Sequence, residues 1–151
     1  MSIRRLPRIL ILIAILTCVA LATLVGVVHA QTPVVRALFF YSPDCPDCMK
    51  TVEQVIRPLQ TKYGSQLDLR LLDVRDSRMY ELMTQLEAEY GIAADKATLP
   101  EVFLETAALI GAPEIKAKLD ETIKGLLAAG GANFPLPKTQ PTATPQQLPT
   151  V

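Results

Sequence analysis

The chain has 151 residues, a length that suits one domain with a hydrophobic core. It carries 15 basic and 15 acidic side chains, but the residues after 30 hold 12 of the basic and all 15 of the acidic ones, which gives that part a net charge of −3 without any basic run. Because nucleic-acid binding depends on clustered Lys and Arg that neutralise phosphates, this distribution argues against a nucleic-acid partner.

Residues 1–30 have the pattern of an export signal. An arginine-rich start precedes an apolar stretch over residues 9–28, and residues 28–30 form a small-residue cleavage site. Since the stretch is also long enough to cross a bilayer, the segment is interpreted as either a cleaved signal peptide or an uncleaved signal anchor. Both interpretations predict that the rest of the chain is extracytoplasmic, secreted or held at the membrane.

Histidine is confined to that signal. His29 is the only histidine, so the exported part of the chain has none. This excludes Cys-His proteases, Ser-His hydrolases and histidine-ligated metal sites from the exported part.

The exported part begins with a strand and a helix. Residues 34–41 form a short, continuous apolar run, which predicts a buried strand. Apolar residues at helical spacing over 46–63 predict an amphipathic helix, kinked late by Pro58 and ended by Gly64.

A second strand and helix follow. Alternating apolar residues over 67–74 predict the strand. Asp76 or Ser77 can cap the next helix, whose apolar stripe ends at Gly91.

Two short strand-like segments, 101–104 and 107–110, flank a two-residue connection and predict an antiparallel hairpin. A last helix begins at residues 111–113 and ends at Gly130-Gly131. Residues 132–151 hold five prolines with Thr and Gln, a composition typical of a disordered tail.

The element order is strand, helix, strand, helix, strand, strand, helix within residues 31–131. One parallel crossover followed by a hairpin predicts an α/β domain, with a four-stranded mixed sheet and helices on both faces.

The most informative motif is Cys45-Pro46-Asp47-Cys48, which stands between the first strand and the first helix. Cysteines at i and i+3 on a first helical turn are close enough to form a disulfide. The positive end of the helix favours a thiolate, so Cys45 at the open end is expected to attack and Cys48, one turn in, to resolve the mixed disulfide.

The acidic neighbours Asp44 and Asp47 are expected to tune the couple together with Pro46. As like charges beside a forming thiolate they destabilise the reduced form. This predicts a moderately reducing couple, with a reduction potential below about −120 mV.

The segment from Phe39 to Cys48, followed some 50 residues later by Leu99-Pro100 before a strand, resembles the thioredoxin superfamily. The element order is that of a minimal thioredoxin or glutaredoxin fold. The chain is also similar to bacterial thioredoxin-like domains associated with vitamin K epoxide reductase-type membrane proteins, which implies a membrane redox partner of that type. The resemblance further implies a cis Pro100 opposite the cysteines, with Leu99 and Pro100 contacting an extended partner.

The sequence thus predicts an extracytoplasmic thiol–disulfide oxidoreductase that acts on protein thiols and disulfides through its own redox-active disulfide, with no other cofactor and no metal. Two alternatives use the same cysteines. One is a structural disulfide, although so short a loop constrains the unfolded chain little. The other is a copper(I)-binding or delivery module, because two thiolates suit a soft ion.

Overall fold

Four strands form a single mixed sheet in the order β2-β1-β3-β4. The strands are β1 (Val35–Tyr41), β2 (Leu67–Asp73), β3 (Glu101–Leu104) and β4 (Ala107–Ile110). The helices are α2 (Pro46–Thr51), α3 (Arg57–Tyr63), α4 (Ser77–Glu89) and α5 (Ala112–Ala128). Strand β1 is parallel to β2 and antiparallel to β3, and β3 and β4 form an antiparallel hairpin. The predicted α/β fold with a four-stranded mixed sheet is therefore confirmed.

This computed structural model describes residues 32–137. The predicted export signal at 1–30 lies outside the described residues, as does the part of the predicted tail after residue 137. Among the residues that the structure describes, no helix is both long and apolar enough to cross a membrane.

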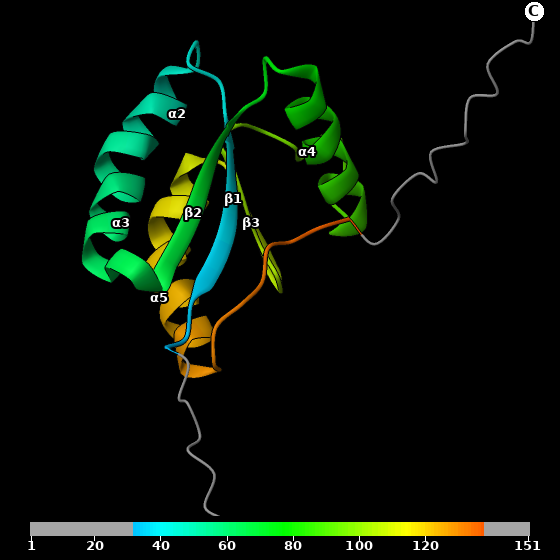
Figure 1. Ribbon diagram of the computed structural model, residues 1–151. Helices are drawn as coiled ribbons and strands as arrows, with labels where there is room; N and C mark the ends of the chain where they lie inside the picture. The colour runs from blue at the N-terminus through cyan, green and yellow to red at the C-terminus, as the bar shows by residue number, and fades with distance from the viewer. Residues whose placement is uncertain (1–31, 138–151) are drawn as a thin grey trace, which may run out of the picture. The chain divides into compact units, whose positions relative to one another are not determined.

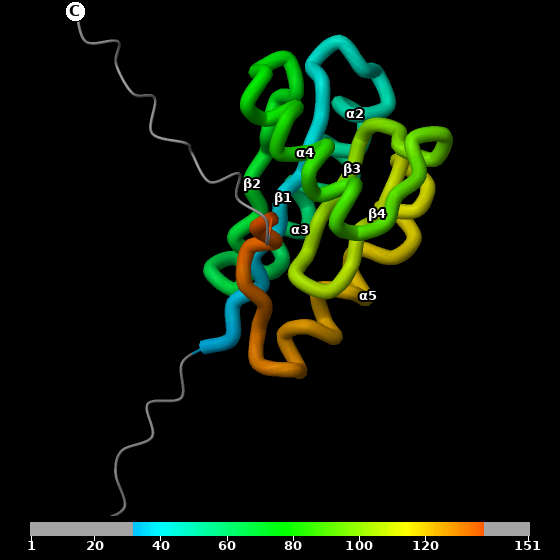
Figure 2. Tube along the Cα trace, turned by 90° about the vertical axis from the view of Figure 1, so that its right-hand side faces the viewer, coloured from blue at the N-terminus to red at the C-terminus, as the bar shows by residue number. Residues whose placement is uncertain are grey.

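Each face of the sheet packs against its own helices (Figure 1). One face packs against the column formed by α2 and α3 and against α5, whose buried stripe is Ile115, Leu119 and Ile123. The other face packs against α4 through Met83 and Leu86. Figure 2 shows α5 following directly from the β3–β4 hairpin, so the start of α5 returns to the sheet end at which β3 begins.

The predicted helix over 46–63 is not one regular α-helix. A π-helical turn, Val52–Ile56, separates α2 from α3, and the Arg57 N–H donates to the Val52 carbonyl five residues earlier. Pro58 is the second residue of α3. Because proline has no N–H and its ring collides with the carbonyl four residues back, the wider turn before it accommodates the ring where a kink was expected.

The predicted tail begins with residues that pack on the domain. The Ala132 N–H donates to Val34 O at 2.9 Å, and Ala132 O accepts from the Arg36 N–H at 3.0 Å. The Phe134 ring packs with the α4-side core beneath the Arg70 guanidinium, 4.1 Å from the ring centroid. The domain therefore continues past the predicted boundary at residue 131, because apolar side chains at its start have a core to join.

The preceding turn depends on glycine at residue 131. Gly131 has φ 101°, and a Cβ there would lie 2.6 Å from the Val34 carbonyl oxygen. Only a residue without a side chain allows the chain to approach β1 this closely.

Candidate active site

The turn after β1 brings the cysteine motif to the end of the sheet. The Cys45 N–H donates to Ser42 O at 3.1 Å, and the Asp44 N–H donates to the Ser42 hydroxyl at 3.2 Å. These two bonds close a tight turn that directs the chain from β1 into α2. The motif is therefore held by a hydrogen-bonded turn at one side and a helix at the other.

Cys45 is the N-cap of α2. Its Sγ accepts the Cys48 N–H at 3.1 Å, and its carbonyl accepts the Met49 N–H at 3.1 Å, which starts the helix. The position after it, Pro46, needs no N–H because the first-turn donors have no partner within the helix. The helix start thus supplies an N–H donor and a positive dipole end to Cys45 Sγ, and both would stabilise a thiolate there.

Cys45 and Cys48 form a disulfide, with their Cα atoms 5.2 Å apart. Cys45 is half-buried, whereas Cys48 is 0% exposed. A partner can therefore approach Cys45 but not Cys48, which is the asymmetry expected for an attacking and a resolving cysteine.

Leu99 and Pro100 lie at the same end of the sheet. Glu101, the first residue of β3, pairs with Phe40 near the end of β1, so the residues just before it lie beside the turn that leads to Cys45. The Leu99–Pro100 peptide bond is cis, as the resemblance implied. Pro100 is buried, and its carbonyl accepts the Gly111 N–H at 2.8 Å.

Arg75 is a charged neighbour of the motif that the sequence analysis missed. The Val74 N–H donates to Tyr41 O at 3.0 Å, which brings the loop after β2 alongside the turn after β1. Arg75 Nη1 lies 3.6 Å from Asp44 Oδ2, while the same guanidinium donates to both carboxylate oxygens of Asp73. The hydrogen bonds from Arg75 hold the pKa of Asp73 below its ordinary value.

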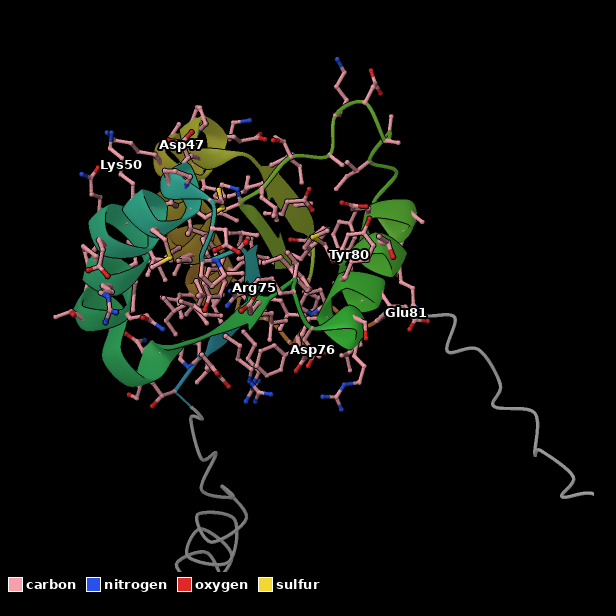
Figure 3. The ribbon with its side chains drawn as sticks, turned by 90° about the horizontal axis from the view of Figure 1, so that it is seen from above. Asp47, Lys50, Arg75, Asp76, Tyr80 and Glu81 are labelled. Carbon is pink, nitrogen blue, oxygen red and sulfur yellow. A yellow bond between two sulfur atoms is a disulfide. The ribbon has the colours of Figure 1, made fainter. Side chains whose placement is uncertain are left out.

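This ion pair changes the expected effect of the acidic neighbours. Asp44 was expected to oppose a Cys45 thiolate, but part of its charge is offset by Arg75. Asp47, in the first turn of α2, is exposed and forms no ion pair with Arg75 or with any other residue in the described part of the chain. Figure 3 looks onto this end of the domain and shows Asp47 on α2, apart from Arg75 in the loop after β2. Asp47 is therefore the acidic neighbour whose charge is least compensated.

The Asp44–Arg75 pair predicts opposite changes in thiol reactivity. In the reduced protein, Arg75→Gln is expected to slow alkylation of Cys45 at pH 7 by about twofold, because Asp44 then acts unopposed. Asp44→Asn is expected to speed the reaction by about the same factor, and the double variant should resemble the wild type. Iodoacetamide kinetics on the four proteins measure this, and equal rates throughout would contradict it.

Glu101 is a second residue that the sequence analysis missed. It is 1% exposed, its Oε1 accepts the Thr98 N–H at 3.1 Å, and its buried Oε2 accepts no hydrogen bond from the described residues. Burial, and then the charge of Glu87 on α4, raise the pKa of Glu101 to about 7. A charged residue in the four-residue strand Glu101–Leu104, directly after Pro100, was the available signal.

Metal ligands are sparse in the described part of the chain. Within residues 32–137, no group of three or more His, Cys, Asp or Glu side chains is arranged to hold a metal ion. The two cysteines are joined to each other.

Together, the β-α-β-α-β-β-α order, the sheet order β2-β1-β3-β4 and the cysteine pair at the start of α2 define an α/β fold of the thioredoxin-like type. No protein family model matches the chain, and no curated protein matches it.

The solved structures that are similar to the chain include three with a TM-score of 0.38 each. Glutaredoxin from Brucella melitensis is 21% identical, over 66% of this chain and 95% of its own. Thioredoxin-2, described as a component of the malaria parasite protein secretion machinery, is 16% identical, over 60% of this chain and 85% of its own. A structure described as a malarial protein is 18% identical, over 58% of this chain and 96% of its own.

Proposed function

We propose that the domain is a thiol–disulfide oxidoreductase that exchanges its Cys45–Cys48 disulfide with cysteine pairs of partner proteins outside the cytoplasm. The observation that supports it most is the asymmetric pair, a half-buried cysteine at a helix N-cap bonded to a fully buried one. A purely structural disulfide gains nothing from an accessible sulfur at a helix start.

The reaction proceeds in two exchange steps. A partner thiolate attacks Cys45 Sγ, which forms a mixed disulfide and releases Cys48 as a thiolate. The partner's second thiolate then attacks its own sulfur in that mixed disulfide and releases Cys45 as a thiolate, stabilised by the Cys48 N–H and the start of α2. The partner loses two electrons and the domain gains them, and the reverse sequence oxidises the domain.

Leu99 and Pro100 are proposed to contact the partner, because they lie at the sheet end that carries Cys45. The extracytoplasmic location and a membrane redox partner of the vitamin K epoxide reductase type are proposals supported by the sequence of residues 1–30 and by the resemblance stated above.

Equilibration of the protein with mixtures of reduced and oxidised glutathione tests the proposed function. We expect one two-electron transition of the Cys45–Cys48 pair, at a potential below about −120 mV, and faster exchange in a reduced or scrambled test protein. A disulfide that neither reaches equilibrium with glutathione nor accelerates exchange would show that the bond is structural.

A further inference from the structure

A cavity of about 310 Å³ lies between two helical segments: α2 with the π-helical turn that follows it, and the start of α5. Its size is at the lower end of the range of ~300–1,000 Å³ that is typical of ligand sites. Its lining includes apolar surface from Val55, Ala112 and Pro113. Lys50 lines it from α2, and Lys116 lines it from α5 on the opposite side. We refer to this cavity as the α2–α5 groove.

The two lysines of the groove are unusual in this domain. Residues 32–137 contain eleven Lys and Arg side chains, of which eight form ion pairs with carboxylates. Lys50 and Lys116 are two of the three others in this part of the chain, and both are exposed. The same residues carry 15 acidic side chains, so this pair of unneutralised cations stands out against a net negative domain. Such a pair attracts an anionic group.

The groove begins close to the reactive sulfur. Asp47, which also lines it, is two residues after Cys45 on the same helix, and Lys50 is five residues after Cys45. At ~1.5 Å per residue, Lys50 lies about 7.5 Å along the helix axis from Cys45. Lys50 also lies about 140° around the helix from Cys45, at 3.6 residues per turn. An extended chain bound through its cysteine at Cys45 covers the axial distance in about two residues, at ~3.3 Å per residue, and needs up to about two more to pass around the helix.

The charges along the groove set its polarity. Asp47 is at the end nearest the disulfide, and Lys50 is one turn further from it; both side chains are labelled on α2 in Figure 3. An acidic group is therefore repelled next to the exchanging sulfur and attracted one turn away from it.

We infer that the α2–α5 groove binds a segment of the partner protein that has an Asp or Glu about two to four residues from its exchanging cysteine. The carboxylate binds between Lys50 and Lys116, and an apolar neighbour packs on Val55, Ala112 and Pro113. This inference deepens the proposed function by naming the substrate class, and as a preference in catalysis it depends on that function.

Reduction of the oxidised full-length protein by two synthetic peptide dithiols tests the inference. One peptide has Glu at the two to four positions next to its cysteines, and the other has Gln there. Each peptide thiolate attacks Cys45 Sγ, and the peptide ends as a disulfide while the domain ends as a dithiol. Comparing the ratio of the two rates between protein variants removes the intrinsic difference in reactivity between the peptides.

The double variant Lys50→Gln/Lys116→Gln is expected to lower the acidic-to-amide rate ratio by about three- to tenfold relative to the wild type. Raising the salt concentration should lower the ratio of the wild type in the same direction. The matched control is Lys118→Gln/Lys124→Gln, which removes two positive charges from α5 outside the groove. It should keep the wild-type ratio. An unchanged ratio in the groove variant, or an equal fall in the control, overturns the inference.

Direct binding separates this inference from the proposed function. A version of the acidic peptide with Ser at both cysteine positions should shift amide NMR signals around Lys50 and Lys116 in the wild type but not in the groove variant. If these shifts appear and no peptide reduces the disulfide, the groove inference stands and the proposed function fails. If exchange occurs while neither the shifts nor the rate ratio depend on the lysines, the groove inference fails alone.

Discussion

Cys48→Ser is expected to convert the protein into a trap that accumulates covalent complexes with its partners through Cys45. The half-buried Cys45 can still form a mixed disulfide, but the buried sulfur that would release the partner from within the domain is gone. Cys45→Ser should instead reduce exchange to the uncatalysed rate and trap nothing, because Cys48 is 0% exposed and no partner can reach it.

Non-reducing electrophoresis followed by mass spectrometry of the linked peptides measures this difference. Cys18→Ser is the matched control, because it removes the third cysteine of the chain and should leave both exchange and trapping unchanged. Equal trapping by the two single variants at positions 45 and 48 would contradict the assigned roles. A Cys48→Ser protein that traps nothing and has instead lost a stoichiometric copper(I) ion would favour the metal-binding alternative.

The fold could be predicted from the sequence because its signals are local. The bounds of the strands over 101–104 and 107–110 were predicted correctly from these two short segments and their two-residue connection. Asp76, one of the two predicted caps, accepts the Arg78 N–H at the start of α4. Each of these features depends on neighbouring residues, which a single sequence displays.

The features that were missed depend on how the backbone adjusts to a side chain, or on contacts between segments that are distant in the sequence. The π-helical turn before Pro58 is a backbone response to the proline ring, and no residue pattern marks it in advance. The pairing of Arg75 with Asp44 follows from the parallel alignment of β1 and β2, which ends both strands at the same edge. Phe134 was assigned to a tail by the composition around it, although one aromatic side chain was enough to join the core.

The site, like the fold, has features that local sequence signals predict and features that depend on contacts across the fold. The sequence identified the cysteine pair and the proline before β3, and the structure puts both at one end of the sheet. The sequence did not reveal which charges around the cysteines and the proline are neutralised, because this depends on which side chains meet across the fold. Asp44 is paired with Arg75, whereas Lys50 and Lys116 line the α2–α5 groove together with Asp47, and neither lysine forms an ion pair within the described residues.

Glu101→Gln is expected to stabilise the oxidised domain at alkaline pH and to remove much of the pH dependence of its stability. The pKa of Glu101 is raised from 4.5 to about 7, first by burial and then by the charge of Glu87. The folded state therefore holds a proton that the unfolded chain releases near pH 4.5. The contribution of this proton to stability is full below about pH 4.5 and is lost as the pH rises through about 7.

The expected size follows from the shift in pKa. A rise of about 2.5 units corresponds to about 3 kcal/mol of unfolding free energy lost between pH 4.5 and pH 8, as an upper limit for a coupled pair of carboxyls. Glutamine keeps an oxygen that can accept the Thr98 N–H, and its amide can donate to Glu87 at any pH. The variant should thus be more stable than the wild type at pH 8, by about 1–3 kcal/mol, and equal or slightly less stable at pH 4.5.

Urea unfolding of the oxidised proteins across this pH range measures the effect. Glu87→Gln should move the midpoint of the wild-type pH dependence to lower pH, because it removes the neighbouring charge that holds the proton on Glu101. Glu121→Gln, which removes an exposed carboxylate from α5, is the matched control and should leave the pH dependence unchanged.

If Glu101→Gln and the wild type lose stability in parallel above pH 7, Glu101 is already ionised in the fold. The buried Oε2 then requires a hydrogen-bond donor from solvent, and the Thr98–Pro100 segment beside Cys45 must open enough to admit it.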